Sequence, residues 1–197
     1  MASTRVLVLY TGGTIGMVPV DTSQPEGARR PGAKDDVLRY IPGIGERDGI
    51  HWELLSDPAL PPVDSSGIRA KDWLNMAPSL IASMPTGTAL SFFMAPAPWP
   101  TPPPRSPFLC ETPGKPVVLT GSQTPLFHHR TDGRLHLIHA LRIAGHRATG
   151  IPLVPEAVIC FGKRVVRGNR ARKMSTTDSD AFDSPNLRPY APRSSAR

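Results

Sequence analysis

The 197-residue chain carries a formal net charge of +7 at pH 7, contains 24 prolines and is 39% hydrophobic. This length allows one sizeable core, and no apolar run approaches the roughly 18 residues of a membrane helix. The five-residue apolar run near the amino end is too short for a secretory signal. We therefore expect a cytoplasmic protein with no membrane partner. Cys110 and Cys160 are too few for a disulfide framework, which favours free thiols.

The first third of the chain predicts two strands and a short helix. Residues 5–10 form a continuous apolar run, which is typical of a buried parallel strand, and a glycine turn, TGGT, follows at once. Residues 18–34 are rich in Pro, Gly, Asp and Ser and predict a loop. Residues 33–41 indicate a short helix, and residues 51–55 indicate a second strand.

The middle of the chain begins regularly and then loses its pattern. Residues 61–67 predict a turn with side-chain caps, and residues 68–83 have a loose helical period. From about residue 83 to 107 we predict no regular element. Within that segment, seven of the fourteen residues from Met94 to Pro107 are proline.

The pattern returns after this segment. Residues 114–126 predict a strand that ends in a polar turn, and residues 132–145 predict an amphipathic helix with a glycine stop. One or two further strands lie within residues 155–169. Strands that alternate with helices predict an α/β fold, an open and mainly parallel sheet flanked by helices on both faces. Ligands in such sheets bind beyond the carboxyl ends of the strands.

Three small polar turns carry groups suited to chemistry: residues 11–14, 64–66 and 120–122. Each offers hydroxyls and backbone N–H groups, and glycine lets a ligand approach the backbone. A hydroxyl in such a turn can attack a carbonyl while N–H groups stabilise the oxyanion. For the TGGT turn, a tight turn with no chemical role is the alternative. TGGT is not a phosphate loop, because the Gly-Lys-Ser/Thr ending is absent.

The basic residues gather late in the chain. Arg167, Arg170, Arg172 and Lys173 do not share one helical face, and no aromatic residues alternate with them. A nucleic-acid site usually combines a basic face with stacking or groove-reading elements. The pattern therefore favours a solvated basic edge over a nucleic-acid partner.

Several longer motifs occur together in one order. They are LYTGGTIGM, DSS, GKPVVLTGSQTPL, TDGRLHLIHAL and RGNRARK followed by DAFDSPN. In this order and spacing they resemble the N-terminal domain of type I (cytoplasmic) L-asparaginases, a family that includes asparaginase-like lysophospholipases. The resemblance covers residues 5–84 and 108–186.

The resemblance implies hydrolysis of L-asparagine to L-aspartate and ammonia by a threonine nucleophile, without metal or cofactor. The nucleophile corresponds to Thr14. Asp64, Ser65 and Ser66 match the turn that holds the substrate's α-amino and α-carboxylate groups. Lys115 matches the lysine of a second Thr-Lys-Asp group. The resemblance also leaves a homodimer or a homotetramer open.

The sequence departs from the family where the catalytic threonine and aspartate of that second group belong. The family has HGTDT there, and this chain has the proline-rich segment of nearly the same length. Codons for Met94 onward, read two bases earlier, allow His-Gly-Thr-Gly-Thr-Met-Ala-Tyr. We interpret residues 85–107 as out of frame within a domain of residues 1–186. Residues 187–197 are expected to be an aberrant tail, and the family's C-terminal domain is expected to be missing.

Two consequences follow from this interpretation. We expect little or no asparaginase activity, because the second Thr-Asp pair is missing. Two smaller departures add to this expectation: residues 27–32 lack the family's tyrosine, and His136 replaces the family's asparagine. The alternative is a non-catalytic interaction protein, because Pro100–Arg105, PTPPPR, fits the PxxPxR pattern that SH3 domains bind.

Overall fold

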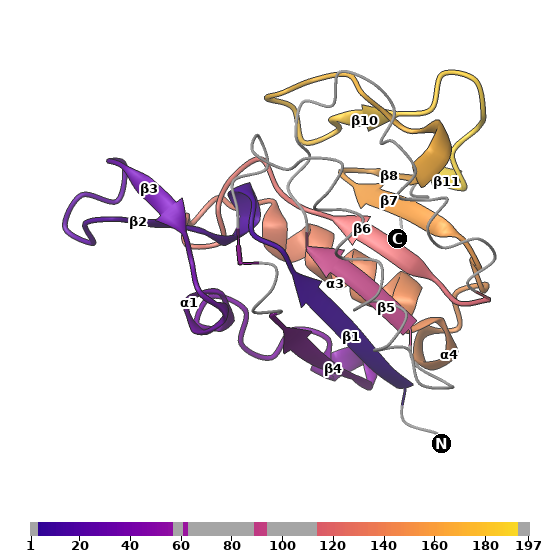
Figure 1. Ribbon diagram of the computed structural model, residues 1–197. Coiled ribbons are helices and arrows are strands. Elements are labelled where there is room, and N and C mark those ends of the chain that lie inside the picture. Colours follow the sequence, from indigo (N-terminus) through magenta and orange to yellow (C-terminus); the bar gives the residue numbers. More distant parts are fainter. Residues whose placement is uncertain (1–3, 57–60, 63–88, 94–113, 193–197) are drawn as a thin grey trace.

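The computed structural model describes residues 4–56, 61–62, 89–93 and 114–192 (Figure 1). Seven of the strands form one sheet in the order β11-β8-β7-β6-β5-β1-β4. Five neighbouring strands are parallel, whereas β8 pairs antiparallel with β7, and β11 pairs antiparallel with β8. The predicted α/β fold with a mainly parallel sheet is confirmed. The strands are β1 (Thr4–Tyr10), β4 (Ile50–Leu55), β5 (Ala89–Phe93), β6 (Val117–Thr120), β7 (Ala157–Phe161), β8 (Arg164–Arg167) and β11 (Ala191–Pro192).

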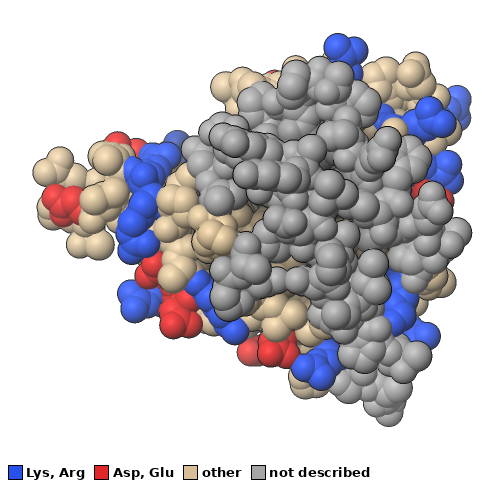
Figure 2. Space-filling model, viewed as in Figure 1, with Lys and Arg blue, Asp and Glu red and all other residues tan. Residues whose placement is uncertain are grey.

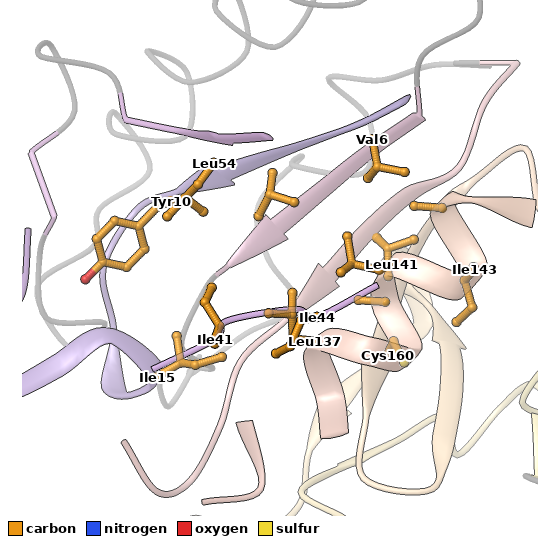
Figure 3. Packing of buried hydrophobic residues seen from close by; sticks show 14 of the residues in the cluster. Val6, Tyr10, Ile15, Ile41, Ile44, Leu54, Leu137, Leu141, Ile143 and Cys160 are labelled. Atoms are coloured by element: carbon orange, nitrogen blue, oxygen red, sulfur yellow. The ribbon is translucent and has the colours of Figure 1, made fainter. Parts of the chain in front are cut away.

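The sheet separates two apolar clusters. Alternate residues of a strand point to opposite faces, so Val6 and Val8 of β1 enter one cluster while Leu7 and Leu9 enter the other. Helix α3 (Gly133–Ala144) packs on the first face, mainly against β6 and β5, and buries Leu137, Leu141 and other apolar side chains in the cluster that also contains Val6 and Val8 (Figure 3). This packing holds α3 across the central strands of the sheet.

The remaining elements are short. Hairpin β2–β3 projects from the body of the molecule (Figure 1). Hairpin β9–β10 brings Ala181 and Phe182 onto the second face, where they pack with Leu7 and Leu119. These elements are η1 (Thr14–Gly16), β2 (Met17–Pro19), β3 (Arg29–Pro31), α1 (Lys34–Leu38), η2 (Glu46–Asp48), α4 (His146–Thr149), η4 (Gly168–Arg170), β9 (Arg172–Lys173) and β10 (Phe182–Asp183).

The sequence-based predictions missed several short strands, among them hairpin β2–β3 and strand β5. Residues 18–34, predicted to be a loop, contribute to hairpin β2–β3, whose strands are too short to give a periodic signal. The segment 83–107, for which no element was predicted, contains β5. β5 lies between β1 and β6 in the centre of the sheet. The helix predicted over 68–83 lies outside the described residues.

The second face also differs from the expectation of helices on both faces. Among the described elements, α1 and α3 place buried side chains in the first cluster, whereas hairpin β9–β10 covers part of the second. No helix in the ranges given above is long and apolar enough to cross a membrane.

Candidate active site

Thr14 stands in a glycine turn at the carboxyl end of β1. Gly12 and Gly13 have φ values of 97° and 80°, in the left-handed region that favours glycine. The short helix η1 starts at Thr14, and the Gly16 N–H donates to the Gly13 carbonyl at 3.0 Å. Thr14 is half-buried, so it lies at the boundary between this packed turn and the surface.

Tyr10, the last residue of β1, stabilises this turn through hydrogen bonds of its hydroxyl group. Its side chain is fully buried, and its hydroxyl donates to the carbonyl oxygens of Gly32 at 3.0 Å and Gly16 at 3.2 Å. Burial raises the pKa of Tyr10 above its ordinary value, and the nearby Asp36 carboxylate adds to that shift. The hydroxyl is therefore a neutral donor that ties η1 to the end of hairpin β2–β3.

A second polar turn follows β6, and Asp132 caps it. The Asp132 carboxylate accepts the backbone N–H groups of Gln123 and Thr124, both at 3.0 Å. The Thr131 hydroxyl donates to the Thr124 carbonyl at 2.9 Å. This turn also contains Ser122, whose buried hydroxyl has no hydrogen-bond partner among the described residues. We call residues 121–124 the Ser122 turn.

The two turns meet at the start of α3. The Leu126 N–H donates to the Ile15 carbonyl at 3.0 Å, which joins the chain after the Ser122 turn to η1. A Cβ at Gly133 would lie 3.1 Å from Ile15 Cγ1 and 3.2 Å from Ser122 Cβ, so glycine permits the close approach of all three segments. Because β1 and β6 belong to the parallel part of the sheet, the turns share its carboxyl edge.

The loop of hairpin β9–β10, residues 174–181, reaches the same edge. The Gln123 side-chain amide donates to the Asp178 carbonyl at 2.8 Å, and the Lys163 N–H donates to Asp180 Oδ1 at 2.6 Å. Lys173, immediately before this loop, is half-buried, and burial lowers the pKa of its amine. A lysine with a lowered pKa is a candidate proton acceptor.

The predicted site residues do not all come together. Thr14 lies at the carboxyl edge as expected, but Lys115 precedes β6 and so lies at the amino edge. The turn of Asp64, Ser65 and Ser66 lies outside the described residues, and its role stays a prediction. The sequence pattern predicts a solvated basic edge for Lys173, because no periodicity indicates that hairpin β9–β10 folds back onto the sheet.

The hairpin β2–β3 contacts the segment after the Ser122 turn. The Arg29 guanidinium lies 5.7 Å from the centre of the Phe127 ring, and His128 Nε2 lies 3.6 Å from Glu26 Oε1.

Within the described ranges, no group of three or more His, Cys, Asp or Glu side chains is placed to hold a metal ion. In Figure 2, the Lys and Arg side chains stand in separate groups around the described margin of this face.

An open, mainly parallel α/β sheet with a threonine turn at its carboxyl edge belongs to the class of proteins that bind ligands beyond the strand ends. Residues 107–196 match the family model described as asparaginase, N-terminal. The chain therefore carries a match to the asparaginase N-terminal domain over these residues, and it is similar to L-asparaginases along most of its length. It is 32% identical to the L-asparaginase of Dirofilaria immitis over 95% of this chain, and 31% identical to L-asparaginase 1 of Escherichia coli K12 over 96%.

The solved structures that are similar to this chain are also L-asparaginases. The chain superposes on L-asparaginase I from Vibrio cholerae with a TM-score of 0.73 and 28% identity over 95% of its length. The thermostable L-asparaginase from Thermococcus kodakarensis gives a TM-score of 0.72 and 25% identity over 94%. The 197 residues span 34% of the Dirofilaria protein, 53% of the E. coli protein and 53% of the Vibrio chain.

Proposed function

We propose that this chain is an L-asparaginase-type amidohydrolase that converts L-asparagine to L-aspartate and ammonia, with Thr14 as the nucleophile. The observation that carries the proposal is the position of Thr14: a half-buried threonine on a glycine turn at the carboxyl edge of the sheet. The family match and the names of the relatives, L-asparaginases among them, support the reaction.

The chemistry follows from the groups at this edge. Thr14 Oγ adds to the side-chain carboxamide carbon of L-asparagine, and a base takes the hydroxyl proton. The base returns this proton to the amide nitrogen, which leaves as ammonia, and water then hydrolyses the aspartyl ester to release L-aspartate and restore the Thr14 hydroxyl. We assign the proton acceptor to Lys173 rather than Lys115, because burial lowers the pKa of the Lys173 amine while Lys115 lies at the opposite edge. Asp64, Ser65 and Ser66 are proposed to hold the substrate's amino and carboxylate groups.

The turnover is expected to be slow. The sequence has no HGTDT segment, so the second Thr-Asp pair that the resemblance implies is missing. Catalytic groups act as units, and the loss of one member commonly removes several powers of ten in rate. We therefore propose a rate well below about one per second for the 197-residue chain. The proposed domain of residues 1–186, a cytoplasmic location and a homodimer or homotetramer belong to the same proposal.

The test is ammonia and L-aspartate release by the purified 197-residue chain, compared with Thr14→Ala prepared in parallel. We expect Thr14→Ala to lower the rate at least about 100-fold. Thr149→Ala is the matched control, because the Thr149 hydroxyl only donates to the Arg142 carbonyl on the remote helix pair α3–α4.

Three results would count against the proposal. Equal rates for the wild type and Thr14→Ala would remove Thr14 as the nucleophile. A wild-type turnover near about one per second would overturn the slow-rate part. A chain that neither hydrolyses L-asparagine nor binds L-aspartate would overturn the function.

A further inference from the structure

Both ring nitrogens of His136 form hydrogen bonds with backbone groups of the described interior. The side chain is 2% exposed, with Nδ1 at 2.8 Å from the Gly121 carbonyl and Nε2 at 3.0 Å from the Gly162 N–H. Because an N–H can only donate, Nε2 must be unprotonated, and the ring proton must reside on Nδ1. His136 is therefore a neutral imidazole in one tautomer that joins the Ser122 turn to the turn between β7 and β8.

These bonds are part of a closed ring of contacts. Beyond Gly162, the Lys163 N–H donates to Asp180 Oδ1 at 2.6 Å, and a Cβ at Gly162 would clash with the Ser179 carbonyl. From Asp178, the ring returns to the Ser122 turn through the side-chain amide of Gln123. The loop 174–181 is thus held to the Ser122 turn twice, once directly and once through His136.

Protonation of the His136 imidazole is incompatible with this closed set of hydrogen bonds. An Nε2–H would face the Gly162 N–H, so two donors would oppose each other and one segment would have to move. Among the described residues, the charged groups nearest the imidazole are Asp132, 3.6 Å from Nδ1, and, beyond Gly162, the Asp180 carboxylate that accepts the Lys163 N–H. Asp132 already accepts two backbone N–H groups, and the Phe161 ring lies 4.5 Å from the imidazole.

We propose that His136 is a positioning residue: as a neutral imidazole it holds the loop 174–181, and with it Lys173, against the Ser122 turn. Protonation on acidification releases that loop. An asparagine at this position offers an acceptor and a donor that do not titrate, so His136→Asn removes the acid sensitivity. The link to substrate rests on the proposed function, whereas the link between the two turns and the loop does not.

The first measurement is a pH titration of the whole chain, followed by backbone and imidazole NMR. Between pH 7.5 and 5.5 we expect the amide signals of Gly121, Gly162 and Asp178 to move with the midpoint of the His136 ring. In His136→Asn these three signals should stay fixed. His139→Asn is the matched control: His139 lies on the same helix, outside this ring of contacts, and its variant should titrate like the wild type. Fixed signals in the wild type, or the same titration in His136→Asn, would overturn the proposal.

The second measurement is calorimetric binding of L-aspartate over the same pH range, in which its side chain stays ionised. The wild type should lose about tenfold in affinity by pH 5.5, the equivalent of one net hydrogen bond. His136→Asn should lose less than about threefold, and His136→Gln serves if that variant does not fold. Equal losses would overturn the effect on the site. No binding at any pH, together with a coupled NMR titration, would reject the proposed function and leave the positioning role of His136 supported.

Discussion

The two turns that meet at the carboxyl edge are supported by different physical means. The turn after β1 is determined by close packing. Gly12 and Gly13 adopt left-handed φ values, and the Tyr10 ring packs directly against Gly16, where a Cβ atom has no room. The turn after β6 depends on polar partners: Asp132 and His136 satisfy its backbone groups. The first should therefore be sensitive to added volume, and the second to lost acceptors and to acid.

The largest effect is expected from added volume at the turn after β1. In Gly16→Ala the new Cβ would lie 2.6 Å from Tyr10 Cζ, and the buried ring has no room to move. Overpacking of this kind costs up to about 3 kcal/mol, and more when backbone must shift. We expect the free energy of unfolding in urea, followed by tryptophan fluorescence, to fall by about that amount. Gly27→Ala in the exposed hairpin loop should cost less than about 1 kcal/mol. Similar losses of unfolding free energy for the two variants would contradict the conclusion that close packing determines the turn after β1.

A smaller loss is expected from the turn after β6. Asp132→Ala leaves the N–H groups of Gln123 and Thr124 without their charged acceptor, and hydrogen bonds to charged groups are worth about 1.5–3 kcal/mol. The free energy of unfolding should fall by about 2–3 kcal/mol. The exposed Asp35, in the first turn of α1, supplies the control: Asp35→Ala should cost about 0.5 kcal/mol. An Asp132→Ala loss no larger than the control would mean that the cap does not hold the turn.

The parts of the fold that could be predicted are those with a dense local signal. The apolar run of β1 and the amphipathic period of α3 specify their own structure, whatever surrounds them. β5 has no such signal: a proline-rich segment begins at Pro96, shortly after the strand, and the central place of β5 depends on pairing with strands far away in the sequence. Hairpin β2–β3 was missed because its three-residue strands are too short to establish a period.

The candidate site divides in the same way. Thr14 could be predicted because its turn is contiguous with the strand that supports it. The placement of Lys115 at the edge of the sheet opposite Thr14 follows from strand direction, which the motif around Lys115 does not reveal. The hydrogen bonds through His136 and Gln123 join residues between 15 and 55 positions apart, so no local pattern predicts them.

The smallest loss of unfolding free energy is expected from removal of the Tyr10 hydroxyl. Its dependence on pH tests the packing of the turn after β1 in the alkaline range. Tyr10→Phe keeps the volume beneath Gly16 and removes only the bonds to Gly16 and Gly32, so at pH 7 it should cost about 1 kcal/mol. Burial raises the pKa of Tyr10, so above about pH 10 the unfolded chain loses a proton that the folded chain keeps. The wild type should then lose up to about 1.4 kcal/mol of stability per pH unit through Tyr10, a loss that Tyr10→Phe escapes. Urea unfolding at pH 7, 10 and 11 should therefore show the two proteins converging, because the phenol then opposes folding. A constant difference across that range would mean that Tyr10 reaches solvent when it ionises.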